Sequence, residues 1–194
     1  YRDRAVRALE ARPGDRVLDV GCGLGLNFPR LPGPAFGVDP SAGQLHVARR
    51  RSRLLAISSA AALPFVDHSF DRLLCTYVLT TVPGWPGALD EMARVLRPGG
   101  RIVVTDDRLP PGWFLGPGPM LRKLWRDGWV DVHREVEAAM RSRFDEVRLE
   151  YYRLQKISEG SISLQDGDAR PLDGPTEVGS GLVRSQPVPL SQLI

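Results

Sequence analysis

The sequence predicts an α/β fold, a doubly wound and mostly parallel sheet of seven strands that ends in an antiparallel hairpin. Two observations predict it. The letters V-L-D-V-G-C-G-L-G at residues 17–25 indicate a buried strand and a glycine turn, and G-V-D-P-S at 37–41 indicates a second strand ending in a carboxylate. Apolar runs then alternate with segments of helical period along most of the chain, which is typical of repeated βαβ units.

Each element is predicted from its own local pattern. Apolar residues recur at helical spacing against a polar face at residues 2–11, 44–53 and 86–96. The helix after the glycine turn must be short, because Pro29 and Pro32 allow little more than a turn or two. Strands are expected at 17–20, 35–39, 54–58, 70–76, 101–105, 143–154 and 161–164, with a turn at Glu159-Gly160 joining the last two.

Length, charge and cysteine content bound the class of protein. A chain of 194 residues suffices for one α/β domain and is short for two. The net charge is +3, without a basic tract interleaved with aromatic residues, so no nucleic-acid partner is expected. No apolar run reaches the ~20 residues of a membrane span, although peripheral membrane contact is compatible with the sequence. Cys22 and Cys75 have neither disulfide nor zinc spacing, so no metal is expected, and a cytoplasmic location is the default expectation.

The composition changes along the chain and predicts its organisation. Residues 1–164 are expected to form the domain. The tail at 165–194 is rich in Gly, Pro and Ser without helical or strand period, which indicates disorder or an extended arm. Three of the four tryptophans lie within the apolar segment 108–130, which we interpret as a lid over a lipophilic acceptor. The alternative is that this segment packs as a helix over the sheet.

The glycine turn and the second strand predict a nucleoside site. Gly21, Gly23 and Gly25 can adopt positive φ angles and let a ligand approach the main chain. Asp39, at the end of the second strand, can accept hydrogen bonds from both hydroxyls of a ribose. The alternative for Asp39 is a cap on the helix that follows.

Asp19 distinguishes between nucleoside ligands. It places an anion at the end of the first strand, where a dinucleotide pyrophosphate is repelled and an α-amino group is attracted. This favours a ligand with a cationic amino-acid end and disfavours a nicotinamide-dependent oxidoreductase, which uses a similar glycine loop. The alternative for Asp19 is a structural pairing with a backbone amide.

Two later segments strengthen the interpretation. Residues 62–71 spell A-L-P-F-V-D-H-S-F-D, and residues 94–100 spell R-V-L-R-P-G-G before a strand that ends at Asp106. With the glycine motif, these segments resemble class I S-adenosylmethionine-dependent methyltransferases over most of residues 5–155, in particular the methyltransferase-11 and quinone-biosynthesis-like small-molecule group. The resemblance implies a Rossmann-like fold, S-adenosylmethionine as the cofactor and S-adenosylhomocysteine as its product.

The resemblance also implies a set of cofactor contacts. Asp19 would hold the amino group of the cofactor through water, and the main-chain carbonyl of Cys75 would meet its amino-acid end. The acidic residue that often reads adenine in this family is absent here, so the Ser59 hydroxyl and the backbone of Ala60 and Ala61 would read it instead. The complete expected set is Asp19, Gly21, Cys22, Gly23, Gly25, Asn27, Asp39, Pro40, Gln44, Ser59, Ala60, Ala61, Cys75 and Thr76.

The catalytic candidates follow from the chemistry of methyl transfer. The reaction is an in-line displacement, so the protein must position the nucleophile and remove its proton if it has one. Asp106, Asp107 and His133 are candidate bases, with turn formation or a solvated helix position as the alternatives, and a tertiary-amine acceptor needs no base. Tyr77 either packs in the core or faces the transferred methyl group. Residues 75–83 lack the Asn/Asp-Pro-Pro-aromatic tetrad of nucleobase amino-methyltransferases, so a DNA base is not the expected acceptor.

The expected function is therefore methyl transfer from S-adenosylmethionine to a nitrogen, oxygen or carbon atom of a small, lipophilic molecule. Two alternatives stay open. One is a methyltransferase-fold protein that binds or regulates a partner without catalysis, and the other, less favoured, is the nicotinamide-dependent oxidoreductase. Neither the identity of the acceptor nor the oligomeric state follows from the sequence.

Overall fold

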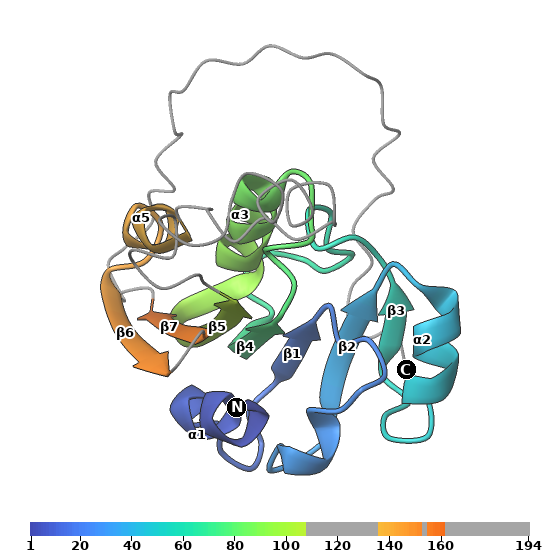
Figure 1. Ribbon diagram of the computed structural model, residues 1–194. Coiled ribbons are helices and arrows are strands. Elements are labelled where there is room, and N and C mark those ends of the chain that lie inside the picture. Colours follow the sequence, from blue (N-terminus) through green and yellow to red (C-terminus); the bar gives the residue numbers. More distant parts are fainter. Residues whose placement is uncertain (108–135, 153–154, 162–194) are drawn as a thin grey trace, which may run out of the picture.

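The structure is a computed structural model that describes residues 1–107, 136–152 and 155–161 of the chain (Figure 1). Its strands form one sheet in the order β3-β2-β1-β4-β5-β7-β6. The first five strands pair in parallel, and β7 runs antiparallel between β5 and β6. The predicted seven-stranded, mostly parallel sheet with a terminal antiparallel hairpin is therefore confirmed.

The element bounds follow the sequence pattern closely in the first half of the chain. The strands are β1 Val17–Val20, β2 Ala35–Asp39, β3 Leu55–Ile57, β4 Phe70–Thr76, β5 Leu96–Asp107, β6 Glu146–Tyr152 and β7 Gln155–Ser161. The helices are α1 Arg2–Leu9, the 3₁₀ helix η1 Phe28–Arg30, α2 Ala42–Ala48, α3 Trp85–Val95 and α5 Val136–Arg141.

Two hydrophobic layers cover the two faces of the sheet. Side chains alternate along β4, so that Leu73 and Cys75 face one layer and Leu74 faces the other. The first layer contains buried residues of α3 and α5, and the second contains buried residues of α1 and α2 (Figure 1). Helices on both faces make this a doubly wound fold, in which ligands bind beyond the carboxyl ends of the strands.

Helix α2 differs from the helix expected at 44–53, because it begins at Ala42 and ends at Ala48. The hydroxyl of Ser41 accepts the backbone N–H of Gln44 at 3.3 Å and so caps the first turn. After the helix, backbone bonds to the third preceding residue tighten the chain into the turn that leads to β3.

The prediction of a turn at Glu159-Gly160 is wrong, because both residues lie inside β7. Gly160 pairs with Val147 of β6, and the two strands are joined through residues 153–154, outside the described residues. A Cβ on Gly160 would lie 3.0 Å from Cβ and Cγ of Phe144. The glycine therefore serves close packing in a strand interior instead of a turn.

Some sequence predictions fall on parts of the chain that the structure does not describe. The expected lid at 108–130, His133 and the tail at 165–194 lie outside the described residues, and so does the domain boundary at 164. These remain predictions.

Candidate cofactor site

The site lies where the winding direction of the sheet reverses. Strand β1 is flanked by β2 on one side and by β4 on the other, and Val20 at its end pairs with both Val38 and Cys75. The sequence-predicted residues of three strands and of the glycine turn therefore meet at one edge. This is the switch point at which doubly wound sheets bind nucleotides.

The glycine turn allows two loops to touch. Gly21, Gly23 and Gly25 all have positive φ angles, at 67°, 53° and 73°. A Cβ on Gly21 would collide with the side chain of Val78, in the loop that follows β4. The turn is anchored to β2, because Cys22 donates its backbone N–H to the carbonyl of Val38 at 2.9 Å.

Asp39 is buried beside this turn and keeps acceptor capacity. Its Oδ2 accepts the N–H of Gly23 at 3.0 Å, and its Oδ1 accepts the N–H of Ser41 at 2.9 Å. A carboxylate oxygen has two lone pairs, so each oxygen can accept one more hydrogen bond. Since Ser41 is the N-cap of α2, Asp39 is not the cap. Gln44 reaches over the turn, with its Oε1 2.7 Å from where a Cβ on Gly23 would stand, and Pro40 is exposed at the rim.

Asp19 is completely buried and is held by a side chain. The Nδ2 of Asn27 donates to both carboxylate oxygens of Asp19 at 3.0 Å and also lies 3.1 Å from the Oγ1 of Thr76. Burial raises the pKa of Asp19 to about 7, although the Asn27 hydrogen bond and the charge of Arg2 both oppose that rise. A cation placed beside this carboxyl group would therefore stabilise its ionised form.

Arg2, on α1, joins this network and was not among the predicted site residues. Its Nη1 donates to the Oδ1 of Asn27 and to the Oγ1 of Thr76, both at 2.9 Å. Its guanidinium carbon also lies 5.4 Å from the centre of the Tyr77 ring. Tyr77 is half-buried at the end of β4 and belongs to neither hydrophobic layer. The partners of Arg2 lie 25 and 74 residues away, so no local pattern could reveal the contact.

The segment expected to meet adenine follows β3. Ser59 and Ala61 are exposed and Ala60 is buried. The Ser59 hydroxyl accepts the N–H of Ala61 at 3.2 Å, and the hydroxyl of Ser58 donates to the carbonyl of Ala62 at 2.6 Å. The segment is thus a turn closed by its own hydroxyl groups, and its five residues contain no charged side chain.

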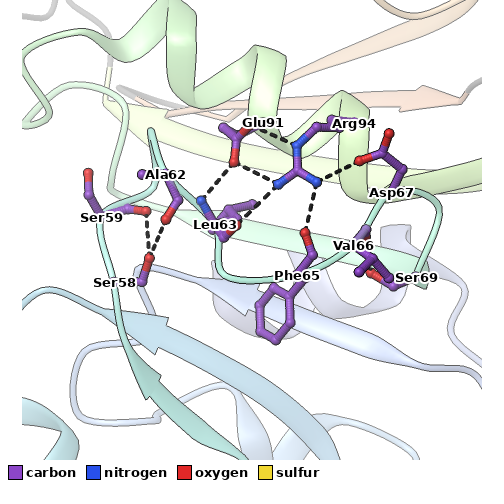
Figure 2. A network of polar contacts seen from close by, with 10 residues as sticks. All are labelled: Ser58, Ser59, Ala62, Leu63, Phe65, Val66, Asp67, Ser69, Glu91 and Arg94. Atoms are coloured by element: carbon purple, nitrogen blue, oxygen red, sulfur yellow. Dashed lines mark hydrogen bonds and ion pairs between the residues drawn. The ribbon is translucent and has the colours of Figure 1, made fainter. Parts of the chain in front are cut away.

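Arg94 binds the end of this segment to α3, as Figure 2 shows. It donates to the carbonyls of Leu63 and Phe65 at 3.1 and 2.8 Å, and it pairs with Glu91 at 2.8 Å and Asp67 at 2.7 Å. Glu91 in turn accepts the N–H of Leu63 at 2.8 Å. Arg94, in the motif at residues 94–100, therefore holds the motif at residues 62–71 in place. The sequence patterns did not single out Arg94 as a site residue.

The catalytic candidates are only partly described. Asp106 is buried, and its two oxygens accept the N–H and the hydroxyl of Thr80 at 3.1 and 2.6 Å. Asp107 is the last residue of β5.

Burial raises the pKa of both the Cys22 and the Cys75 thiols, so neither is a reactive nucleophile. Within the described part of the chain, no cluster of side chains could hold a metal, and no helix is long and apolar enough to span a membrane.

The arrangement fits a nucleoside that carries an amino acid. Asp39 has one spare lone pair on each oxygen beside a glycine turn that leaves the main chain accessible, and Asp19 is a buried acid that a cation would ionise. The sheet order, the glycine turn and these two carboxylates are the features expected of the cofactor-binding domain of class I S-adenosylmethionine-dependent methyltransferases.

Comparison with known proteins agrees with this class. Residues 18–104 match the family described as "Methyltransferase domain". A demethylmenaquinone methyltransferase of Beutenbergia cavernae is 40% identical over 116 residues, covering 57% of this chain and 48% of the relative. A 2-phytyl-1,4-naphtoquinone methyltransferase of Synechococcus elongatus is 35% identical over 147 residues, covering 67% of this chain and 60% of the relative. The chain thus spans about half to three fifths of the length of these curated relatives.

A solved structure supports the fold alone. The S-adenosylmethionine-dependent methyltransferase of Thermotoga maritima superposes with a TM-score of 0.66 at 23% identity, covering 84% of this chain and 88% of that protein. The Rossmann-like architecture expected from the sequence is therefore confirmed.

Proposed function

We propose that this chain transfers a methyl group from S-adenosylmethionine to a nitrogen, oxygen or carbon atom of a small lipophilic molecule. The observation that carries the proposal is the geometry of Asp39. Each of its oxygens accepts one backbone N–H, and the remaining lone pairs match the two vicinal hydroxyls of a ribose. The buried Asp19 beside it favours an amino-acid end over a pyrophosphate.

In this proposal each part of the site binds one part of the cofactor. S-adenosylmethionine supplies an electrophilic methyl group on a cationic leaving group, so the protein contributes chiefly alignment. Asp39 binds the ribose hydroxyls, and Asp19 attracts the α-ammonium group. The main chain of Cys75 and Thr76 borders the amino-acid end. The Ser59 hydroxyl and the backbone of Ala60 and Ala61 border the adenine; the remaining expected contacts are Gly21, Cys22, Gly23, Gly25, Asn27, Pro40 and Gln44.

The acceptor side is proposed from the relatives and from composition. The two curated relatives are named for demethylmenaquinone and a phytyl naphthoquinone, which supports a lipophilic ring compound as the acceptor. The aromatic segment 108–130 is its proposed lid. Tyr77 borders the methyl group, and Asp106, Asp107 and His133 stay the candidate bases. Asp106 accepts both the N–H and the hydroxyl of Thr80, so it also fits a role in fixing the loop after β4.

The proposed cellular setting follows from the same chemistry. A lipophilic acceptor dissolves in membranes, so peripheral contact with a bilayer is part of the proposal, whereas a nucleic-acid partner is not. We also retain the cytoplasmic location, because both cysteines are free thiols, as is usual in reducing compartments.

Calorimetric titration with S-adenosylmethionine, S-adenosylhomocysteine and NADH tests the proposal. We expect saturable binding of the first two ligands and none of NADH. Asp39→Asn keeps the shape of the side chain, but it loses the charge and replaces one of the two oxygens that accept the N–H groups of Gly23 and Ser41 with an amide donor, so it should weaken binding about tenfold or more. Binding of NADH alone, or binding that Asp39→Asn leaves unchanged, would overturn the assigned site.

The alternative of a non-catalytic methyltransferase-fold protein rests on two features of the sequence, the absence of a carboxylate at Ser59–Ala61 and the lack of a clear general base. Transfer of a labelled methyl group to reduced naphthoquinones, measured with the wild-type chain and with Asp39→Asn, separates the two. Cofactor binding without transfer to any acceptor of this class would favour the non-catalytic protein.

The oxidoreductase alternative finds no support in the fold. Tyr-x-x-x-Lys is a catalytic pair of nicotinamide-dependent oxidoreductases, and this spacing occurs once in the chain, from Tyr152 to Lys156. These residues lie in β6 and β7, which are antiparallel neighbours, and not on one helix, where that spacing would bring the two side chains together.

A further inference from the structure

We propose that Arg2 binds the α-carboxylate of the cofactor, so that Arg2 and Asp19 together recognise the two charges of an amino acid. The inference rests on the proposed S-adenosylmethionine site and adds a specificity residue from α1, a helix that contributes no other predicted contact.

The first support is the unused donor capacity of Arg2. A guanidinium has five N–H donors in a planar fork, a geometry that matches a carboxylate. The contacts of Arg2 to Asn27 and Thr76 both use Nη1. Among the described residues, neither Nε nor Nη2 of Arg2 takes part in a hydrogen bond with another protein group. Arg2 therefore reaches the site with donors to spare.

The second support is the pairing of charges. The amide of Asn27 donates to Asp19 through Nδ2 and accepts from Arg2 through Oδ1. A single side-chain amide thus separates a buried anion from a cation. An α-amino acid carries an ammonium and a carboxylate on one carbon atom, so it requires this kind of adjacent anion and cation. A ligand with only a phosphate or only an amine would meet one of the two with like charge.

The third support is that Arg2 is held in place from another side. Its guanidinium lies against the ring of Tyr77, whose backbone has a φ angle of 62°. A non-glycine residue with such an angle is strained, and strain of this kind gathers at ligand sites. The N–H of Tyr77 donates to the carbonyl of Thr105 at 2.7 Å, which helps to fix this conformation. The guanidinium is therefore oriented before any ligand arrives.

Three ligands test the assignment in the full chain by calorimetry. S-adenosylhomocysteine has both charges of the amino acid, decarboxylated S-adenosylmethionine lacks the carboxylate, and 5′-methylthioadenosine lacks both. We expect Arg2→Met to weaken binding of S-adenosylhomocysteine about tenfold or more, and to change binding of the other two less than twofold. Arg7→Met is the matched control, because Arg7 is exposed on the same helix.

Several results would overturn the assignment. Equal weakening of all three ligands would mean that Arg2 only braces the loop after β4, and unchanged binding of S-adenosylhomocysteine would mean that it does not touch the cofactor. If Arg2→Met fails to fold, Arg2→Gln keeps a polar side chain without the charge and should show the same selective loss. Failure of wild type to bind S-adenosylhomocysteine would overturn the proposed function itself, whereas the variant results address Arg2 alone.

Discussion

The two ends of the proposed cofactor site are built in different ways. The amino-acid end consists of Arg2, Asp19, Asn27 and Thr76, side chains that are buried or half-buried and joined by hydrogen bonds of 2.9 to 3.1 Å. The adenine end, at Ser59–Ala61, has no charged side chain and consists of a small turn. The first end offers charge, and the second offers shape and main-chain groups.

This difference indicates where binding energy and its cost are concentrated. Hydrogen bonds to charged groups contribute roughly 1.5–3 kcal/mol, about twice the contribution of neutral ones. A buried charge also destabilises the empty protein, because the carboxylate has left water. The amino-acid end should therefore dominate affinity and pH dependence, while the adenine end should respond mainly to changes in loop position.

The largest expected effect concerns the pH dependence of stability without cofactor. The pKa of Asp19 is about 7 in the folded chain, above the 3.8 of an exposed aspartate. Between these values the folded chain keeps a proton that the unfolded chain has released, so the free energy of unfolding falls as the pH rises. The loss is complete above pH 7 and amounts to about 4 kcal/mol. Urea unfolding of wild type and Asp19→Asn between pH 4 and 8 measures it, and parallel curves would contradict the expectation.

The same substitution should have a large effect on affinity. Asp19→Asn removes the anion that attracts the α-ammonium group, so binding of S-adenosylhomocysteine at pH 8 should weaken about a hundredfold, or roughly 3 kcal/mol. Calorimetry measures the change. Asp71→Asn is the matched control, because Asp71 is also buried but lies near the start of β4, where it accepts the N–H of Arg16 at 2.6 Å. Equal losses in both variants would show that the effect is structural.

A smaller effect is expected when the adenine end is released from α3. Arg94→Met removes donors to the carbonyls of Leu63 and Phe65 and should lower the free energy of unfolding by about 2 kcal/mol. It should also weaken binding of 5′-methylthioadenosine, which contacts the site without an amino acid. Arg141→Met is the control, because its pair with Glu137 is exposed and contributes at most about 0.5 kcal/mol. An unchanged free energy of unfolding of Arg94→Met would contradict the proposed role of Arg94 in holding Leu63 and Phe65 against α3.

The smallest expected effect is a gain. Ser59→Asp supplies the charged acceptor that the adenine end lacks and can still accept the N–H of Ala61, so affinity for S-adenosylhomocysteine should rise less than tenfold. Ser59→Asn provides the same acceptor without the charge and should leave affinity nearly unchanged. If both variants bind alike, the end does not discriminate by charge, and the contrast between the two ends is smaller than we infer.

Much of the fold follows from local sequence pattern. Strand β4 has the predicted bounds, Phe70–Thr76, because its apolar residues alternate between the two hydrophobic layers. Glycine is harder to interpret. Gly160 follows a glutamate in a polar stretch and resembles a turn residue, but its neighbour in space, Phe144, decides its role. Sequence alone does not distinguish a glycine required for close packing from one required for a turn.

The residues of the site likewise fall into those that local sequence predicts and those that depend on contacts between distant elements. Asp39 and the glycines were predictable, since their spacing along one βαβ unit determines their geometry. Arg2 and Arg94 were not predicted as site residues, because their roles depend on contacts between elements far apart in the chain. Arg94 reaches Leu63 and Asp67 across 31 and 27 residues. The composition of a local segment holds no information on such distances.

The contact of Arg2 with Thr76 also has a consequence for the order of folding. The two residues are 74 positions apart, while the glycine turn and Asp39 lie within one short segment. The ribose part of the site can therefore assemble early, from neighbouring residues, but the amino-acid part requires closure of a long loop. A chain in which β4 has not yet paired with β1 lacks that part. Binding of a nucleoside that carries an amino acid therefore indicates that the centre of the sheet has formed.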